Sequence, residues 1–332
     1  MRNLLYIVVF IQTLLVSILA IPGLIKVAFK YDVVDKPGAR KVHQIPHPLL
    51  GGVAIAGSFL GVILLNLFLF YLFGKADVIH NNLPALSRLF PLLRTVLPKL
   101  LLLLGGGLAI HILGLLDDIF KERIPYQVKF IAQFVIAVIV AIGGIRTDFM
   151  PHESLDVIIT VIWIVGMTNS FNLLDNLDGL TAGVGVISAI VLFIIAFLQG
   201  QVFFAFILSA LAGASLGFLL YNFHPSKLFM GDSGSLFIGY IFGALTVMGS
   251  YVVNSSTSLL PVLIPILVLS VPLYDTFSVM FIRWREGRPL FVGDKRHFSH
   301  RLLDLGMSHR QAVSFIYLVC LGVGMTAILL PY

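Results

Sequence analysis

Ten runs of apolar residues alternate with short polar segments along the chain. An α-helix needs about 20 apolar residues to cross the hydrocarbon core of a bilayer. The pattern therefore predicts an all-α polytopic membrane protein with about ten transmembrane helices, and residues 1–332 read as one integral membrane domain without repeats or linkers. The runs are 3–25, 51–73, 97–116, 127–145, 155–171, 179–199, 202–221, 235–254, 257–282 and 311–331.

The composition supports a membrane protein and excludes several other classes. Of the 332 residues, 58% are hydrophobic and 11% are charged, and the mean hydropathy of +1.01 is far above that of a soluble domain. The single Cys320 excludes a disulfide within the chain. Residues 3–25 lack a small-residue cleavage site, so we expect a retained first span rather than a signal peptide. No feature of the sequence indicates a nucleic-acid partner.

Positive charges divide unequally between the two sides of the predicted bundle. Ten spans place both termini on one side, and that side receives 16 of the 22 Lys and Arg residues. The positive-inside rule makes this side cytoplasmic. Its basic residues are Lys26, Lys30, Lys36, Arg40, Lys41, Lys121, Arg123, Lys129, Lys227, Arg283, Arg285, Arg288, Lys295, Arg296, Arg301 and Arg310.

Carboxylate and imidazole side chains gather on the same side, which membrane targeting does not explain. We therefore expect an active site at the cytoplasmic face, and we expect neither outer loop, 74–96 or 146–154, to be catalytic. The acidic and histidine residues of the inner side are Asp32, Asp35, Asp117, Asp118, Asp175, Asp178, Asp232, Asp294, Asp304, His43, His47, His224, His297, His300 and His309.

The stretch 169–183 places polar groups at a regular spacing between two apolar runs. Asn169, Asn172, Asp175 and Asp178 recur every third residue, and Asn176 adds another amide. On a helix these side chains share one face. Hard oxygen ligands at such spacing suit Mg²⁺, or Mn²⁺ in its place, bound with a phosphate. The alternative is a polar loop that only joins two spans.

Two further inner segments present candidate phosphate contacts. Lys36, Arg40 and Lys41 in the first inner loop either clamp a diphosphate or attract anionic lipid, and the loop alone favours neither. Asp117 and Asp118 repel each other unless a cation or proton intervenes. One could bind a metal while the other orients a nucleophile. The alternative is that they pair with Lys121 or Arg123. Lys129, one turn into the fourth run, reaches toward a lipid phosphate.

The last two inner segments add an acid and a basic loop. Asp232, between Gly231 and Ser233, either holds a metal that bridges to an anion or caps the eighth span. In the loop 283–303, His297 and His300 lie beside many Arg residues, which favours phosphate contact over zinc. Asp275 lies inside the ninth run, where a buried acid is expected to be functional or paired.

Together these motifs resemble the polyprenyl-phosphate N-acetylhexosamine-1-phosphate transferases, and among them the bacterial undecaprenyl-phosphate GlcNAc-1-phosphate transferases of the WecA and TagO type. The resemblance rests on D-x-P-x-x-R-K-x-H at 35–43, the pair 117–118, N-x-x-N-x-x-D-x-x-D-G at 169–179, and the segments G-D-S-G-S and H-x-x-H-R. It implies ten or eleven spans in the bacterial inner membrane, a cytoplasmic active site and Mg²⁺. The implied reaction moves GlcNAc-1-phosphate from UDP-GlcNAc to undecaprenyl phosphate and releases UMP, as the first membrane step of a cell-envelope glycan.

The resemblance also implies roles for individual residues. The implied catalytic residues are Asp117, Asp118, Asp175, Asp178 and His297. The implied substrate-binding residues are Asp35, Lys36, Arg40, Lys41, His43, Lys129, Asn169, His300 and Arg301. Asp232 matches a metal ligand, with Asn172 as its partner. The chain departs from the family at Asn176, where Gly is usual, and at Ser299, where a further His is common.

Two alternative functions compete with this one. The same chemistry with UDP-MurNAc-pentapeptide usually accompanies adjacent His residues after a Pro, whereas this chain has His297-Phe298-Ser299-His300-Arg301. An ion-coupled transporter would place charges near the bilayer midplane in two related halves. Here the acids other than Asp275 lie at inner span ends, and the halves show no symmetry. The sequence leaves the choice between a monomer and a homodimer open.

Overall fold

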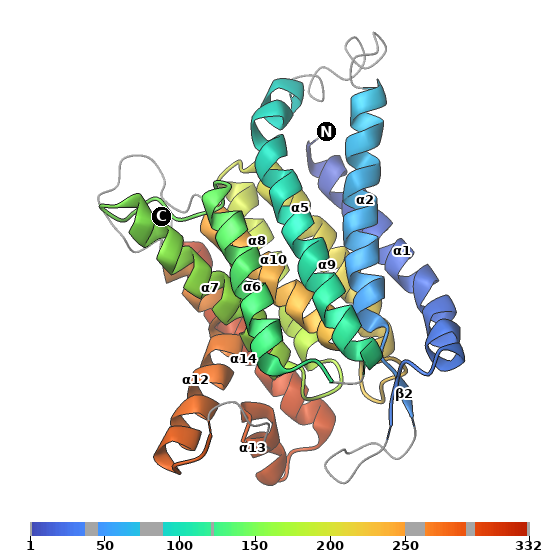
Figure 1. The fold of residues 1–332 in the computed structure, drawn as a ribbon. Coiled ribbons are helices and arrows are strands. Elements are labelled where there is room, and N and C mark those ends of the chain that lie inside the picture. Colours follow the sequence, from blue (N-terminus) through green and yellow to red (C-terminus); the bar gives the residue numbers. More distant parts are fainter. Residues whose placement is uncertain are drawn as a thin grey trace.

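The computed structural model describes residues 2–36, 46–73, 89–120, 123–249, 263–289 and 296–330, and these residues form an almost entirely helical bundle (Figure 1). The described strands are β1 (Val34–Asp35) and β2 (His47–Pro48), which pair antiparallel with Val34 opposite Pro48. The helices are α1 (Arg2–Lys30), α2 (Gly51–Phe73), α5 (Leu89–Phe120), α6 (Tyr126–Ile142), α7 (Glu153–Leu174), α8 (Leu180–Leu198), α9 (Val202–Asn222), α10 (Asp232–Met248), α11 (Ile264–Val268), α12 (Ser270–Arg285), α13 (Phe298–Asp304) and α14 (His309–Leu329).

Seven of the described helices are long and apolar enough to cross a membrane: α1, α2, α5, α7, α8, α9 and α14. Helices α6 and α10 are apolar but shorter, at 17 residues each. The all-α polytopic fold is therefore confirmed. The count of ten spans stays a prediction.

The ninth predicted span, 257–282, is not one continuous helix in its described part. The chain forms the short α11, turns at Leu269 and continues as α12. Pro272 has no N–H to donate to the carbonyl of Val268, and its ring crowds that carbonyl, so a continuous helix would be strained here. The Val268 carbonyl instead accepts a hydrogen bond from the Ser188 hydroxyl at 3.2 Å. Helix α12 then extends beyond the bundle, next to α13 (Figure 1).

Helix α10 forms the centre of the bundle. Every residue from Ser233 to Thr246 is buried, and the helix packs mainly against α5 and α7. A second group is built around α9, which packs against α1 and α8. Because α10 is covered on all sides, its first residue, Asp232, has a fixed position relative to the ends of α5 and α7.

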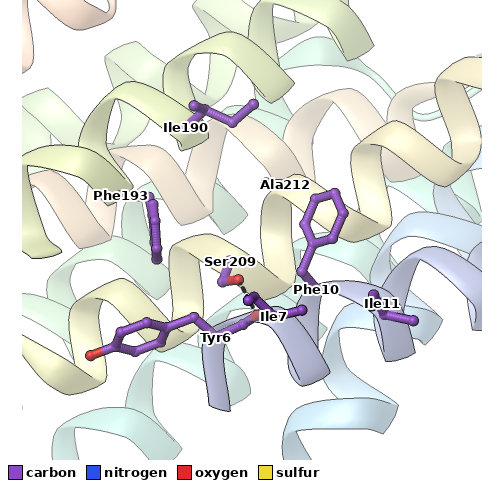
Figure 2. A pocket seen from close by; sticks show the side chains of 8 residues that line it. All are labelled: Tyr6, Ile7, Phe10, Ile11, Ile190, Phe193, Ser209 and Ala212. Carbon is purple, nitrogen blue, oxygen red and sulfur yellow. Dashed lines mark hydrogen bonds between the residues drawn. The ribbon is translucent and has the colours of Figure 1, made fainter. Parts of the chain in front are cut away.

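An apolar groove of about 410 Å³ lies between α1, α8 and α9 (Figure 2). The Ser209 hydroxyl donates a hydrogen bond to the Tyr6 carbonyl at 2.7 Å. The other lining residues are Tyr6, Ile7, Phe10, Ile11, Ile190, Phe193 and Ala212. None of the predicted site residues lines this groove.

Candidate active site

A lysine bridges two carboxylates where three helices meet. The Lys129 ammonium on α6 lies 2.8 Å from Oδ2 of Asp117 on α5 and 3.0 Å from Oδ2 of Asp232 on α10. Asp117 is only 1% exposed, whereas the Lys129 side chain is 22% exposed. Residues separated by more than a hundred positions therefore form one ionic cluster, open to solvent on its lysine side.

A fourth helix joins the cluster through Asn172. Its Nδ2 donates to Oδ1 of Asp232 at 2.8 Å and to the Ser235 hydroxyl at 2.9 Å. Both oxygens of Asp232 thus have partners, Asn172 on one side and Lys129 on the other. In this arrangement Asn172 orients Asp232 through its amide nitrogen, and turning the amide over would present its oxygen to a shared cation.

Asp118 holds the first turn of α10 instead of facing the lysine. Its Oδ1 accepts from the Asp232 backbone N–H at 2.8 Å, and its Oδ2 accepts from the Ser233 N–H at 3.0 Å. Such contacts satisfy donors that a helix start leaves unpaired. Gly231 allows the approach, because it has φ +69° and a Cβ there would lie 2.5 Å from Asp118 Oδ2. Asp118 therefore fixes the backbone of Asp232.

The donor set of this cluster fits a hard divalent cation. Asp117 and Asp232 contribute two carboxylates against the single ammonium of Lys129, while both oxygens of Asp118 accept backbone N–H bonds. Among the described residues, Oδ1 of Asp117 is buried without a hydrogen-bond partner. Carboxylate and amide oxygens are the ligands that Mg²⁺ and Mn²⁺ prefer. The residues fit the predicted metal, and its binding here stays a prediction.

The N-x-x-N-x-x-D-x-x-D-G motif spans a helix end. Helix α7 ends at Leu174, and Asp175 is its C-cap residue. The expectation of one helical face is therefore wrong from Asp175 onward. Asn169 lies inside the helix and donates to Gln133 on α6 at 2.5 Å. Gln133, buried to 3% exposure, was not predicted, because a lone Gln in an apolar run has no distinguishing spacing.

Asp175 lies between the two spans in a poorly solvated position. Burial, reinforced by the negative charges of Asp232 and Asp178, raises the pKa of Asp175 to about 7. The carboxyl is therefore poised to exchange a proton near neutral pH, which is compatible with its predicted catalytic role.

Asp178 faces a different group of side chains. Its Oδ2 lies 2.9 Å from Nδ1 of His224 and accepts from the Ser226 N–H at 3.1 Å. Nε2 of His309 lies 3.2 Å from the Asp178 carbonyl oxygen. The sequence placed both histidines on the inner side but gave them no role, since they lie in separate loops without a shared motif.

The H-x-x-H-R segment is held to the bundle by a buried acid. Oδ2 of Asp275 lies 2.7 Å from Nδ1 of His297, and Oδ1 of Asp275 accepts from the Phe298 N–H at 2.6 Å. Asp275 is 1% exposed, so the prediction that it is paired is confirmed. The contact fixes the ring of His297.

The other members of this segment also have defined positions. The ring of His300 lies 6.4 Å from that of His297. Arg301 donates to the Ser278 hydroxyl at 3.0 Å and lies over the ring of Tyr274 at 5.9 Å. Its Nε is buried without a hydrogen-bond partner among the described residues. This donor is available to an anion.

The first inner loop is described only in part. Asp35 belongs to β1, and Lys36 forms an exposed ion pair with Asp32 at 3.0 Å. Arg40, Lys41 and His43 lie outside the described residues. The diphosphate clamp predicted for this loop therefore stays a prediction.

Comparison with known proteins gives the family. Residues 100–250 match glycosyl transferase family 4. The chain is 36% identical to the probable undecaprenyl-phosphate N-acetylglucosaminyl 1-phosphate transferase of Bacillus subtilis, over 98% of this chain and 84% of that protein. It is 35% identical to the decaprenyl-phosphate N-acetylglucosaminephosphotransferase of Mycolicibacterium smegmatis, over 88% of this chain and 73% of that protein.

A third relative has lower identity and similar coverage. The undecaprenyl-phosphate alpha-N-acetylglucosaminyl 1-phosphate transferase of Salmonella typhi is 29% identical, over 91% of this chain and 78% of its own length. The matched region 100–250 contains Asp117, Lys129, Asn172 and Asp232, the side chains that the fold brings together. This chain belongs to glycosyl transferase family 4, the family of these polyprenyl-phosphate N-acetylglucosamine phosphotransferases.

Proposed function

We propose that this chain transfers GlcNAc-1-phosphate from UDP-GlcNAc to undecaprenyl phosphate at the cytoplasmic face of the bacterial inner membrane. The products are undecaprenyl diphosphate-GlcNAc and UMP. The names of the relatives support the lipid and the transferred group. The excess of basic residues on the inner loops supports the orientation. The observation that supports the reaction most strongly is the Asp117–Lys129–Asp232 contact, which joins three helices in one charged cluster.

The reaction exchanges the phosphoanhydride partner of the β-phosphate, from UMP to the lipid phosphate. An oxygen of the lipid phosphate attacks the β-phosphorus of UDP-GlcNAc, and the bond from that phosphorus to the UMP oxygen breaks. The bond between sugar and phosphate stays intact. A phosphate monoester has its second pKa near 6, so the nucleophile is mostly ionised at neutral pH and needs no strong base. For Asp117, two roles remain: orienting the lipid phosphate, or taking its residual proton.

The residues divide between the two anionic substrates. Lys129, at the inner end of α6, would leave its carboxylate partners to meet the lipid phosphate. Arg301, whose buried Nε has no hydrogen-bond partner within the described ranges, would bind the diphosphate of the nucleotide sugar, together with Arg40 and Lys41. Asp118 would keep Asp232 in place through the backbone of α10.

Asp232 and Asp117, with Asn172 beside them, would hold a Mg²⁺ ion. When bound, Mg²⁺ supplies positive charge to the diphosphate and to the departing UMP. The two substrates are both anions and must approach each other. The surrounding ammonium and guanidinium groups would, like the metal ion, lower the repulsion between them.

A panel of UDP-sugars tests this function. Purified protein is incubated with undecaprenyl phosphate, Mg²⁺ and one radiolabelled UDP-sugar at a time, and label in the butanol-extractable lipid is counted. We expect transfer from UDP-GlcNAc and little from UDP-MurNAc-pentapeptide. Preference for the pentapeptide donor would move the chain to the alternative substrate, and no lipid-linked label from any donor would refute the proposal.

Labelling from one side of the membrane tests the orientation. A cysteine replacing the exposed Asp304 should react with an impermeant maleimide only in inverted vesicles. A cysteine replacing Asp148 should react only in intact cells. The opposite pattern would put the charged cluster on the outer face, out of reach of UDP-sugars.

A further inference from the structure

Three side chains at the inner end of the bundle converge outside the Asp117–Lys129–Asp232 cluster. Asp178 precedes α8, His224 follows α9, and His309 begins α14. Among the described residues, they are the group of His, Cys, Asp and Glu side chains close enough to share an ion, with one ligand atom from each within 4.8 Å of the others. We propose that Asp178, His224 and His309 bind a first-row transition-metal ion such as Zn²⁺.

The donor types select this class of metal. Imidazole nitrogens suit Zn²⁺, Fe²⁺, Co²⁺ and Ni²⁺, whereas Mg²⁺ takes oxygen ligands. Two imidazoles and one carboxylate form a set of three protein ligands that leaves a position for water or substrate. The site is therefore chemically distinct from the all-oxygen set of Asp117, Asp232 and Asn172.

The backbone around the three side chains is fixed by other contacts. The Gly179 N–H donates to Oδ1 of Asn222 at 2.9 Å, which joins the start of α8 to the end of α9. The Tyr317 hydroxyl donates to the Gly179 carbonyl, which joins α14 to the same point. The site is thus preorganised, and an ion would not have to gather separate loops.

The side chains themselves lie close to binding geometry. Nδ1 of His224 is 2.9 Å from the Asp178 carboxylate, and the rings of His224 and His309 stack at 4.1 Å. A bound metal ion would displace the imidazole protons that now form the hydrogen bonds of His224 and His309. The Asp178 carboxylate keeps its bond from the Ser226 N–H, which orients it from behind.

The surroundings allow an ion to enter. The His224 side chain is 40% exposed and that of Asp178 is 20% exposed. The guanidinium of Arg310, a positive charge beside His224, is bonded to the His224 carbonyl at 3.0 Å. A bound ion would brace the segment 223–231, which leads directly into Asp232.

Metal binding is measured on the full-length protein in detergent, purified with a tag that lacks histidine and stripped with a chelator. We expect one Zn²⁺ per chain in the presence of millimolar Mg²⁺, and a visible absorption spectrum with Co²⁺. His224→Asn and His309→Asn should each weaken binding at least about tenfold. His152→Asn, at the start of α7 on the outer side, is the matched control and should bind as the unmodified protein does.

Two further variants guard against misreading a folding defect. His309→Cys should restore Zn²⁺ binding and shift the Co²⁺ spectrum, because a thiolate replaces the imidazole. Asp232→Asn should keep the zinc site while losing transfer, so this proposal and the proposed function fail independently. Absence of stoichiometric Zn²⁺ binding, or unchanged binding in both His→Asn variants, would overturn the proposal.

Discussion

The hydroxyl of Ser299 lies 2.5 Å from Oδ1 of Asn176. In sequence, these two positions depart from the motifs that the chain resembles, and they are separated by 123 residues. The contact joins the H-x-x-H-R segment to the turn after α7. Ser299 and Asn176 therefore form one structural feature in this chain.

A double-mutant cycle tests this coupling. Ser299→Ala and Asn176→Ala should each lower kcat/KM for UDP-GlcNAc, because each leaves the other group without its partner. The kcat/KM of the double variant should be no lower than that of the less active single variant. The two changes should then show a coupling free energy of about 0.5–3 kcal/mol. Effects that add to within about 0.5 kcal/mol would show that the two side chains act independently.

Asp118 should act on metal affinity through α10. Its carboxylate accepts two backbone N–H bonds, from Asp232 and Ser233. A hydrogen bond to a charged group is worth about 1.5–3 kcal/mol, so Asp118→Ala should raise the Mg²⁺ concentration for half-maximal activity on the order of tenfold or more.

Asp118→Asn is the conservative comparison, because it keeps one acceptor oxygen and should have a smaller effect. If both variants require the same Mg²⁺ concentration as the unmodified protein, Asp118 does not position Asp232.

Asp175 should make stability depend on pH. Its pKa is raised from 3.8 in the unfolded chain to about 7 in the folded state, so the folded state holds the proton more tightly. The stabilising contribution of the protonated form is present below about pH 4 and is lost as the pH rises to about 7.

Asp175→Asn cannot ionise, so it should raise the apparent Tm at pH 8 more than at pH 5, in chelator-treated protein. Thermal unfolding followed by intrinsic fluorescence provides the measurement. An equal change in Tm at both pH values would contradict the raised pKa of Asp175.

Lys129 and Arg301 should affect different substrates. Lys129→Ala should mainly raise the apparent KM for undecaprenyl phosphate, and Arg301→Ala that for UDP-GlcNAc. A lost charge-assisted contact costs about 1.5–3 kcal/mol, or on the order of tenfold to over a hundredfold in kcat/KM. The test compares, for each variant, the change in KM for undecaprenyl phosphate with the change in KM for UDP-GlcNAc. If both variants weaken binding of the same substrate equally, Lys129 and Arg301 do not serve different substrates.

Much of the fold follows from the length of the apolar runs, because a bilayer requires about 20 such residues in a helix. The interruption between α11 and α12 in the ninth run was not predicted, because hydropathy does not register Pro272, which has no N–H for the Val268 carbonyl. The turn after α7 coincides with the gap between the fifth and sixth apolar runs, 155–171 and 179–199, although its polar spacing also suits one helical face. Helix α7 nevertheless ends at Leu174, and Gly179, at φ +80°, is the N-cap residue of α8.

The candidate site was predictable where a motif marked it. Asp117, Asn172 and Asp232 lie in recognisable motifs, and Lys129 stands out as a charge in an apolar run. Gln133, His224 and His309 have no such local signal, because only tertiary packing brings them to Asn169 and Asp178.

The fate of the β-phosphate tests the central claim most directly. UDP-GlcNAc labelled with ³²P at the β-phosphate and with ³H in the sugar is offered to purified protein with undecaprenyl phosphate and Mg²⁺. The account predicts that both labels enter the lipid in equal amounts and that unlabelled UMP is released. Asp232→Asn should abolish this transfer, whereas Asp148→Asn in the outer loop should not change it. Sugar label in the lipid without ³²P, or full activity of the Asp232→Asn variant, would contradict phosphosugar transfer at the Asp117–Lys129–Asp232 cluster.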